Sequence, residues 1–152
     1  MTIRIEPERP DTPEAMQLIE ELEAALSPLY PQESRHGYSV AKLLAQGVAF
    51  FVTRQDGEPV GCGGIQVFGV EYGELKRMYV RPAFRGLGLA AQMLEQLSRH
   101  ARQQGIQVLR LETGIHQHEA IGLYERHGFQ RRPPFGDYQP DPLSLWFEKV
   151  LA

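Results

Sequence analysis

The sequence predicts an α/β (α+β) protein built on one mixed central sheet. Strand-type runs outnumber helical patterns along the 152 residues. Asp56-Gly57 stands between two apolar runs, which is a strong signal for a β-hairpin. Further along the chain, the order strand, helix, strand predicts a crossover between strands of the same sheet. Hairpins followed by crossovers therefore indicate a sheet with both antiparallel and parallel neighbours.

The first third of the chain predicts a strand, a long helix, a loop and a short helix. Thr2–Glu6 alternates as a strand does, and Asp11–Glu14 combines a capping residue, an early proline and an acid, which marks a helix start. A loop over Ser27–Gly37 leads to a short helix over Val40–Gln46, for which Gly47 is the expected stop. Apolar residues at helical spacing should turn the first helix toward the core: Ala15, Leu18, Ile19, Leu22, Ala25 and Leu26.

Three strands are expected in the middle of the chain. They cover Val48–Thr53, Val60–Phe68 and Glu74–Arg81, and the turn Gln55–Glu58 joins the first two. The side chains of a strand alternate between the two faces of its sheet. Alternation in the third strand predicts one face with Glu74, Lys76, Met78 and Val80, and an opposite face with Leu75, Arg77 and Tyr79.

The last third predicts two helices and two further strands. An amphipathic helix ends at Gly105, and the strand Ile106–Glu112 follows it. A shorter helix stops at Gly128, and an extended piece lies near Phe129. A proline- and glycine-rich loop over Pro133–Pro142 then leads to a last strand over Leu143–Val150. The apolar faces of the two helices contain Ala90, Met93, Leu94, Leu97 and Ala101, and Ala120, Ile121, Leu123 and Tyr124.

Length and composition indicate one domain over residues 1–152, with a single substantial core. The net charge of −3 argues against broad nucleic-acid binding, which usually requires a basic excess. The one cysteine, Cys62, cannot form an internal disulfide, and its strand-like context predicts a small buried side chain rather than a nucleophile. No signal segment and no long apolar run is present, so we expect a cytoplasmic protein that does not bind a membrane.

The most informative segment is Arg85-Gly86-Leu87-Gly88-Leu89-Ala90, which joins a strand-type run to the amphipathic helix. The first N–H groups of a helix have no partner within it, and the helix dipole places partial positive charge there. Two glycines let an anion approach the backbone, and the arginine adds a positive charge. The segment therefore predicts a binding site for a phosphorylated ligand.

A dinucleotide site is one alternative, because Gly86–Ala91 fits the pattern G-x-G-x-x-A and an acid, Glu112, follows at a suitable distance. In that fold the first glycine directly follows a strand that is buried on both faces. Here Arg81–Arg85 intervene, and the preceding strand contains Glu74, Lys76 and Arg77. This reading is therefore disfavoured.

Two motifs resemble those of the GNAT superfamily of N-acetyltransferases, and the order of elements extends the resemblance over essentially the whole chain. Glu74–Pro82 followed by Arg85-x-x-Gly88-x-Ala90 resembles its pyrophosphate loop, Q/R-x-x-G-x-G/A. Ala120–Phe129 resembles its second landmark, A-I-x-L-Y-x-x-x-G-F. The resemblance implies a mostly antiparallel sheet of about six to seven strands, flanked by about four helices and splayed between the fourth and fifth strands.

The resemblance also implies acetyl-CoA as the cosubstrate, a primary amine as the acceptor and no metal. The pyrophosphate would bind the amides of Arg85–Ala90, and the pantetheine arm would pair with Met78, Tyr79 and Val80 as an added strand. An N–H of Met78 or Val80 would stabilise the oxyanion. Gln117 stands where many relatives have asparagine and would offer amide donors to the cofactor.

Two proton-transfer roles follow from the resemblance. Tyr124 stands at the position of the family's tyrosine acid and would protonate the departing thiolate, or else it only packs between helix and sheet. Glu74 is the predicted base, or else a solvated strand residue paired with Lys76 or Arg77. Glu112, His116 and His118 are lesser candidates, and the two histidines alone do not make a metal site.

The acceptor pocket of the family lies between the loops that correspond to Leu29–Tyr38 and Pro133–Pro142. Both loops are aromatic and polar, which suits a small zwitterionic amine, although packing alone explains the same residues equally well. Asp137 and the predicted acceptor residue Glu33 would attract an ammonium, and Arg35 would bind a carboxylate. The other predicted acceptor residues are Tyr38, Phe135 and Tyr138.

Three functions stay open at this point. The first is acetylation of a small amine, such as an amino acid or an amine-like metabolite. The second is acetylation of a protein or peptide, which would need an open groove across the sheet. The third is a non-catalytic acyl-CoA sensor, which would need neither Tyr124 nor an acid near the thioester. Homodimers are common in the family, but the residues themselves do not indicate the oligomeric state.

Overall fold

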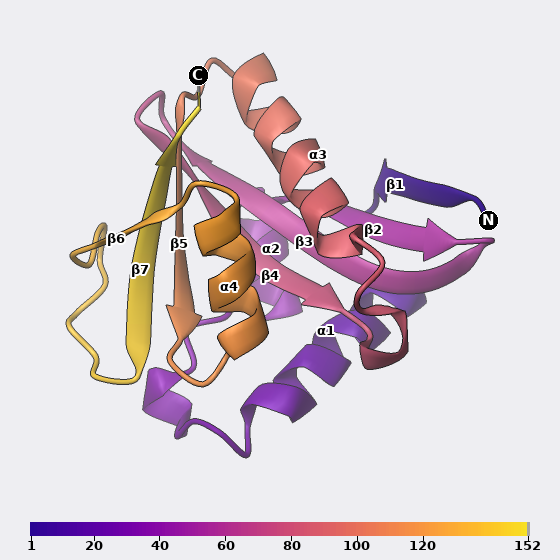
Figure 1. The fold of residues 1–152 in the computed structure, drawn as a ribbon, viewed down its shortest axis with the longest axis horizontal. Helices are drawn as coiled ribbons and strands as arrows, with labels where there is room; N and C mark the ends of the chain where they lie inside the picture. The colour runs from indigo at the N-terminus through magenta and orange to yellow at the C-terminus, as the bar shows by residue number, and fades with distance from the viewer. Residues whose placement is uncertain (152) are drawn as a thin grey trace.

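The computed structural model describes residues 1–151, which form a seven-stranded sheet in the order β1-β2-β3-β4-β5-β7-β6. Helices α3 and α4 cover one face of the sheet and α1 and α2 the other (Figure 1). The strands are β1 Ile3–Pro7, β2 Ala49–Gln55, β3 Glu58–Phe68, β4 Tyr72–Val80, β5 Val108–Gly114, β6 Gln130–Arg132 and β7 Ser144–Val150. The helices are α1 Pro13–Leu26, α2 Val40–Ala45, α3 Leu89–Gln103 and α4 His118–Arg126, with short 3₁₀ turns at Gln32–Ser34 and Pro82–Phe84. The mixed, mostly antiparallel sheet and the four helices confirm the predicted fold class.

Local signals account for most element boundaries. Thr12 caps α1, because its side chain accepts a hydrogen bond from the Ala15 N–H at 3.2 Å. Asp56 and Gly57 both have positive φ, 51° and 85°, as a type I′ hairpin turn requires. This turn connects β2 to β3 and confirms the predicted hairpin.

Three predicted strands begin too early, for one shared physical reason. Gly47, Gly105 and Gly128 adopt left-handed conformations just after α2, α3 and α4. The N–H of the next residue then closes the helix, and these bonds run from Val48 to the Leu43 carbonyl, from Ile106 to the Ala101 carbonyl and from Phe129 to the Tyr124 carbonyl. The apolar residue after each glycine is therefore part of the helix end and not of the strand.

Cys62 lies in the core between the sheet, α1 and α2, where its thiol donates a hydrogen bond to the Arg77 carbonyl at 3.3 Å. Burial raises the pKa of this thiol to about 12. The cysteine is thus the small buried side chain that its strand context predicted. A second core, between the sheet, α3 and α4, includes Phe147 and Leu97, both fully buried.

Strands β4 and β5 run parallel and pair only at Gly73–Leu109 and Glu74–Arg110. Beyond these residues the two strands separate, which confirms the predicted splay (Figure 1). The edge of β4 from Leu75 onward therefore has no strand partner on the β5 side, and its polar groups on that side face the gap.

The predicted alternation of β4 is wrong beyond Lys76. Two steps along β3, from Cys62 to Gly64, face three steps along β4, from Tyr79 back to Lys76. The extra residue forms a β-bulge at Arg77, whose φ is 54°. Because the bulge reverses the alternation, Met78 faces α3 and α4 together with Leu75, and Tyr79 faces α1 and α2.

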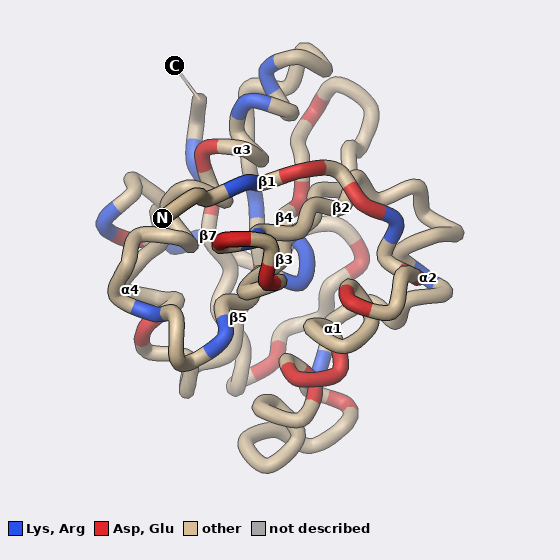
Figure 2. The backbone as a smooth tube through the Cα atoms, turned by 90° about the vertical axis from the view of Figure 1, so that its right-hand side faces the viewer, with Lys and Arg blue, Asp and Glu red and all other residues tan. Residues whose placement is uncertain are grey.

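Acidic side chains of α1 attach this helix to the splayed half of β4. Glu23 pairs with the buried Arg77 at 2.7 Å, and Glu21 pairs with Arg81 at 2.8 Å. Figure 2 shows the acidic positions along α1. Across residues 1–151 the helices are all too short or too polar to cross a membrane.

Candidate active site

Two adjoining cavities lie beside the edge of β4 that β5 leaves free. The outer cavity has a volume of about 590 Å³ and lies between α1, the end of β4, the start of α3 and α4. The inner cavity, about 100 Å³, lies beneath the loop of residues 34–37 and is bordered by β4 and β5. Six residues line both cavities, so the two spaces meet there: Leu22, Leu26, Met78, Gln117, Ala120 and Tyr124.

The glycine turn forms one end of the outer cavity. Gly86 and Gly88 have φ angles of 80° and 78°, and a Cβ at either would meet nothing within 4 Å. The backbone conformation, and not crowding, therefore favours glycine at these two positions. No side chain caps α3, and its first backbone bond is from the Gln92 N–H to the Gly88 carbonyl. The preceding N–H groups are thus available to an anion.

The turn residues line the outer cavity to different degrees. Gly86, Gly88, Leu89 and Ala90 belong to its wall, whereas the Leu87 side chain projects into solvent. Arg85 also lines this cavity, where its Nε donates a hydrogen bond to the Val80 carbonyl at 3.0 Å.

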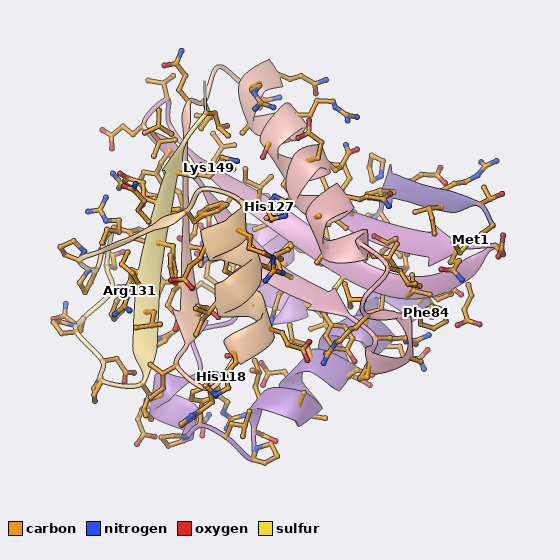
Figure 3. The ribbon with its side chains drawn as sticks, in the orientation of Figure 1. Met1, Phe84, His118, His127, Arg131 and Lys149 are labelled. Carbon is orange, nitrogen blue, oxygen red and sulfur yellow. The ribbon has the colours of Figure 1, made fainter. Side chains whose placement is uncertain are left out.

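Two basic residues at the C-terminal end of α4 line the outer cavity, and the sequence analysis did not place them there. They are Arg126 and His127, at the opposite end of α4 from His118 (Figure 3). A signal for His127 was present, because Ala120, Leu123, Tyr124 and His127 recur at the spacing of one helix face. The same face that brings Tyr124 to the cavity therefore brings His127.

Tyr124 lies where the two cavities meet. Its ring packs against Phe129 and Phe147, with centroid distances of 5.5 and 6.2 Å, and only 5% of the residue is exposed. Burial, together with the nearby charge of Glu112, raises the pKa of the Tyr124 hydroxyl. The hydroxyl therefore keeps its proton at neutral pH, which is the state that a general acid needs.

Glu112 projects from β5 into the inner cavity. Its Oε2 accepts a hydrogen bond from Ser144 Oγ at 2.7 Å. Burial raises the pKa of the Glu112 carboxyl, although this hydrogen bond and the nearby His36 oppose the shift. His36 lines the same cavity and lies 3.2 Å from Asp141 Oδ2, a contact that links the two predicted acceptor loops.

Glu74 borders neither cavity and is only 3% exposed. Its Oε2 accepts hydrogen bonds from Lys76 Nζ at 2.8 Å and from the Tyr138 hydroxyl at 2.6 Å. The Lys76 ammonium also lies 3.8 Å above the centre of the Tyr38 ring. Burial lowers the pKa of Lys76, and the Glu74 carboxylate opposes this effect. Glu74 is thus paired with Lys76, but inside the protein rather than in solvent.

The predicted acceptor residues lie at different depths. Arg35 lines the inner cavity, while Tyr38 and Tyr138 cover the Glu74–Lys76 pair beside it. Phe135 is buried in a separate aromatic cluster with Tyr72 and Trp146. Glu33 and Asp137 are exposed and line neither cavity.

Gln117 lines both cavities just before α4. Its Oε1 accepts a hydrogen bond from the Gly114 N–H at 3.2 Å, so the side-chain amide is oriented and its NH₂ group remains a donor. Among residues 1–151, no three histidine, cysteine, aspartate or glutamate side chains come together as a metal site would require.

Comparisons with known proteins agree with this geometry. A sequence model of the Acetyltransferase (GNAT) family matches residues 15–129. The chain is 44% identical over 150 residues to the IAA acetyltransferase of Azospirillum brasilense, covering 98% of each protein. It is 40% identical to a candidate acyl-CoA N-acyltransferase of Klebsiella pneumoniae, whose crystal structure superposes with a TM-score of 0.85 over 99% of both chains.

A more distant structure shares the same fold. The PaiA N-acetyltransferase of Thermoplasma acidophilum, solved in complex with coenzyme A, is 19% identical, with a TM-score of 0.78 over 99% of each chain. The matched family model, the relatives over nearly full length and the splayed sheet with its glycine turn all lead to the same assignment. The chain is an enzyme of the GNAT acetyltransferase family.

Proposed function

We propose that this enzyme transfers the acetyl group of acetyl-CoA to a primary amine of a small molecule, such as an amino acid or an amine-like metabolite. One observation carries the proposal. A large cavity with free helix N-terminal amides meets a small polar cavity at Tyr124 and Met78. A donor and an acceptor can therefore be bound together, one in each cavity, with the reacting atoms at the junction.

The residues that line the outer cavity suit the chemistry of coenzyme A. The Arg85 N–H already donates to the Pro82 carbonyl, so the amides over Gly86–Ala90 would hold the pyrophosphate, and Arg126 lies within the same wall to bind further phosphate charge. The pantetheine arm would run beside Met78, Tyr79 and Val80, on the edge of β4 that β5 leaves free. Gln117 would donate its amide hydrogens to this arm.

The position of the one cysteine supports direct transfer. Cys62 is buried and lines neither cavity, so it does not serve as an acyl carrier. The amine nitrogen attacks the thioester carbon directly, and the bond between carbon and sulfur breaks as the amide forms. An N–H of Met78 or Val80 stabilises the oxyanion, and Tyr124 gives its proton to the departing sulfur.

The proton released by the amine needs an acceptor at the inner cavity. Glu112 lines this cavity, whereas both donors to Glu74 Oε2, from Lys76 and Tyr138, compete with any proton that Glu74 would take. The geometry therefore supports Glu112 over the predicted base Glu74. Glu74 stays a prediction that the variants described below can separate from Glu112.

Substitution of Gly88 tests the phosphate site, and Gly105 offers a matched control. Both glycines have positive φ, 78° and 77°, both have open space around them, and they flank the same helix. Gly88→Ala and Gly105→Ala should each lower the free energy of unfolding by about 1 kcal/mol. Only Gly88→Ala should weaken coenzyme A binding, by about tenfold, the value of one lost hydrogen bond to a charged group. Calorimetric titration with coenzyme A measures the difference, and equal affinities in the two variants would contradict this site.

The acceptor class is tested by release of coenzyme A in the presence of single compounds. Purified enzyme with acetyl-CoA is offered a panel of small primary amines and a panel of peptides with free N-termini. We expect rapid thiol release with members of the first panel, because the inner cavity is small and lies beneath a loop. Faster reaction with peptides would instead support a protein or peptide N-acetyltransferase. Slow hydrolysis that no amine accelerates would support an acyl-CoA sensor.

A further inference from the structure

The inner cavity has opposite charges in its wall, and this pairing indicates the class of acceptor. Arg35 comes from the loop after α1, and Glu112 comes from β5. The cavity volume of about 100 Å³ equals the liquid volume of about three water molecules. A small molecule bound in this cavity would therefore lie against a wall to which both residues belong.

The positive charge of Arg35 is incompletely neutralised inside the protein. Glu23 is shared by two arginines, and its contact with Arg77 is the closer one, at 2.7 Å against 3.4 Å for Arg35. Arg77 also donates to the Tyr38 carbonyl at 2.8 Å, and its side chain is only 4% exposed. Arg77 is thus satisfied by its own partners, and the charge of the single Glu23 carboxylate is divided between two guanidinium groups, with Arg77 on Oε1 and Arg35 on Oε2.

Arg35 is left with unused donors beside the cavity. Among residues 1–151 its buried Nε has no hydrogen-bond partner, and its one ion pair is the long contact to Glu23. A half-buried guanidinium in this state favours an added anion, and a carboxylate can accept two of its N–H bonds in parallel. The Nε is enclosed and Nη1 contacts Glu23, but among residues 1–151 Nη2 has no hydrogen-bond partner and is not buried, so an anion can bind Arg35 at this nitrogen.

We propose that the acceptor is a free amino acid, with its carboxylate bound by Arg35 and its amine directed to Glu112. The inference rests on the proposed function, because it names the substrate of that same site. The nitrogen forms the amide with the acetyl carbon, one amine proton passes to Glu112, and the products are an N-acetyl amino acid and the free thiol of coenzyme A. Peptide N-termini, amino acid amides and diamines lack the carboxylate and are poor substrates.

The test uses three matched acceptors at saturating acetyl-CoA: an amino acid, its C-terminal amide and the amine left by its decarboxylation. Amino acids from the reactive part of the amine panel supply the starting compounds. The wild-type enzyme should favour the amino acid over the other two in kcat/KM by about 10- to 100-fold, the range for a lost hydrogen bond between charged groups. Most of the difference should lie in KM, because the carboxylate contact is made before and during reaction alike.

Variants of Arg35 test whether this side chain causes the preference for the amino acid. In Arg35→Gln the three acceptors should become similar in kcat/KM, while Arg35→Lys should retain part of the preference because it keeps the charge. Arg102→Gln is the control, because Arg102 also makes one long ion pair, 3.9 Å to Glu95, but lies on α3 outside both cavities. It should keep the full preference.

The role of Arg35 and the acetylation of small amines can be overturned separately. Equal reaction of the wild type with the acid, the amide and the amine would overturn the assignment of Arg35 and leave small-amine acetylation intact. A preference for the amino acid that survives in Arg35→Gln would likewise overturn the assignment of Arg35. Absence of amine-dependent thiol release with every compound would overturn the proposed function itself.

Discussion

Replacement of Tyr124 by phenylalanine is expected to lower kcat by about 10²- to 10⁴-fold, the usual contribution of a positioned general acid. Tyr124 lines both cavities where they meet, and the raised pKa of its hydroxyl keeps the proton at neutral pH. Without this proton the sulfur must leave as a thiolate, beside the apolar side chains of Met78 and Ala120 that line the same junction. The affinity for coenzyme A should change little, because the ring and its contacts with Phe129 and Phe147 remain.

Stopped assays of kcat and calorimetric titration of coenzyme A separate these two quantities. Tyr72→Phe is a suitable control, because Tyr72 is also buried and stacked, 4.8 Å from Phe68, but lines neither cavity. The control should retain the wild-type kcat. If Tyr124→Phe also kept kcat within twofold of wild type, Tyr124 would be only a packing residue.

Local patterns were sufficient to predict most of the fold. The hairpin at Asp56-Gly57, the cap at Thr12 and the glycine stops of the helices all act within a few residues, so the chain itself contains the signal. The phosphate turn is predictable for the same reason, since it needs only glycines with positive φ and an uncapped helix start. The splay of β4 from β5 came from the family resemblance and not from the residues.

The bulge in β4 had no local signal. Arg77 adopts a left-handed conformation that favours glycine, and strand periodicity predicts ordinary alternation at this position. What holds Arg77 in place is distant in sequence, namely the Glu23 carboxylate and the Tyr38 carbonyl. An error of one residue in register then reversed the predicted faces of Met78 and Tyr79.

The burial of the Glu74–Lys76 pair on β4 also had no signal in the sequence. Glu74 and Lys76 have the composition of a solvated strand face, yet Tyr38 and Tyr138 from two separate loops cover them. Burial of this kind depends on which loops meet, and 62 residues separate Lys76 from Tyr138. Of the two predicted acceptor loops only the first lines the inner cavity, and among the predicted acceptor residues only Arg35 does so.

Replacement of Glu112 by glutamine is expected to reduce kcat/KM by about 10²- to 10⁴-fold without loss of stability. Glutamine keeps an oxygen acceptor for Ser144 Oγ but cannot take a proton from the amine. The wild-type rate should rise with pH as Glu112 ionises, at a pKa above the ordinary carboxyl value of 4.5. This acidic limb of the pH–rate profile should disappear in the variant.

The stability of Glu112→Gln tests the raised pKa of Glu112 independently of the reaction rate. A carboxyl whose pKa is higher in the folded than in the unfolded protein favours folding while it is protonated, and this contribution is lost as the pH rises from 4.5 through the folded pKa. At neutral pH ionised Glu112 therefore lowers the free energy of unfolding relative to a neutral side chain of the same shape. Glu112→Gln should unfold at the same or a higher temperature than wild type at pH 7, and at a more similar temperature near pH 4.

Glu74→Gln is the matched comparison, because it removes a buried carboxylate of the same length that lies outside both cavities. Its loss leaves the Lys76 ammonium buried without its 2.8 Å partner, so this variant should be markedly less stable at neutral pH. A group kept at a cost to stability, with a large effect on rate when it is neutralised, is typical of a catalytic position. If instead Glu74→Gln removed the acidic limb and Glu112→Gln retained it, the base would be Glu74, and the inner cavity would have only a binding role.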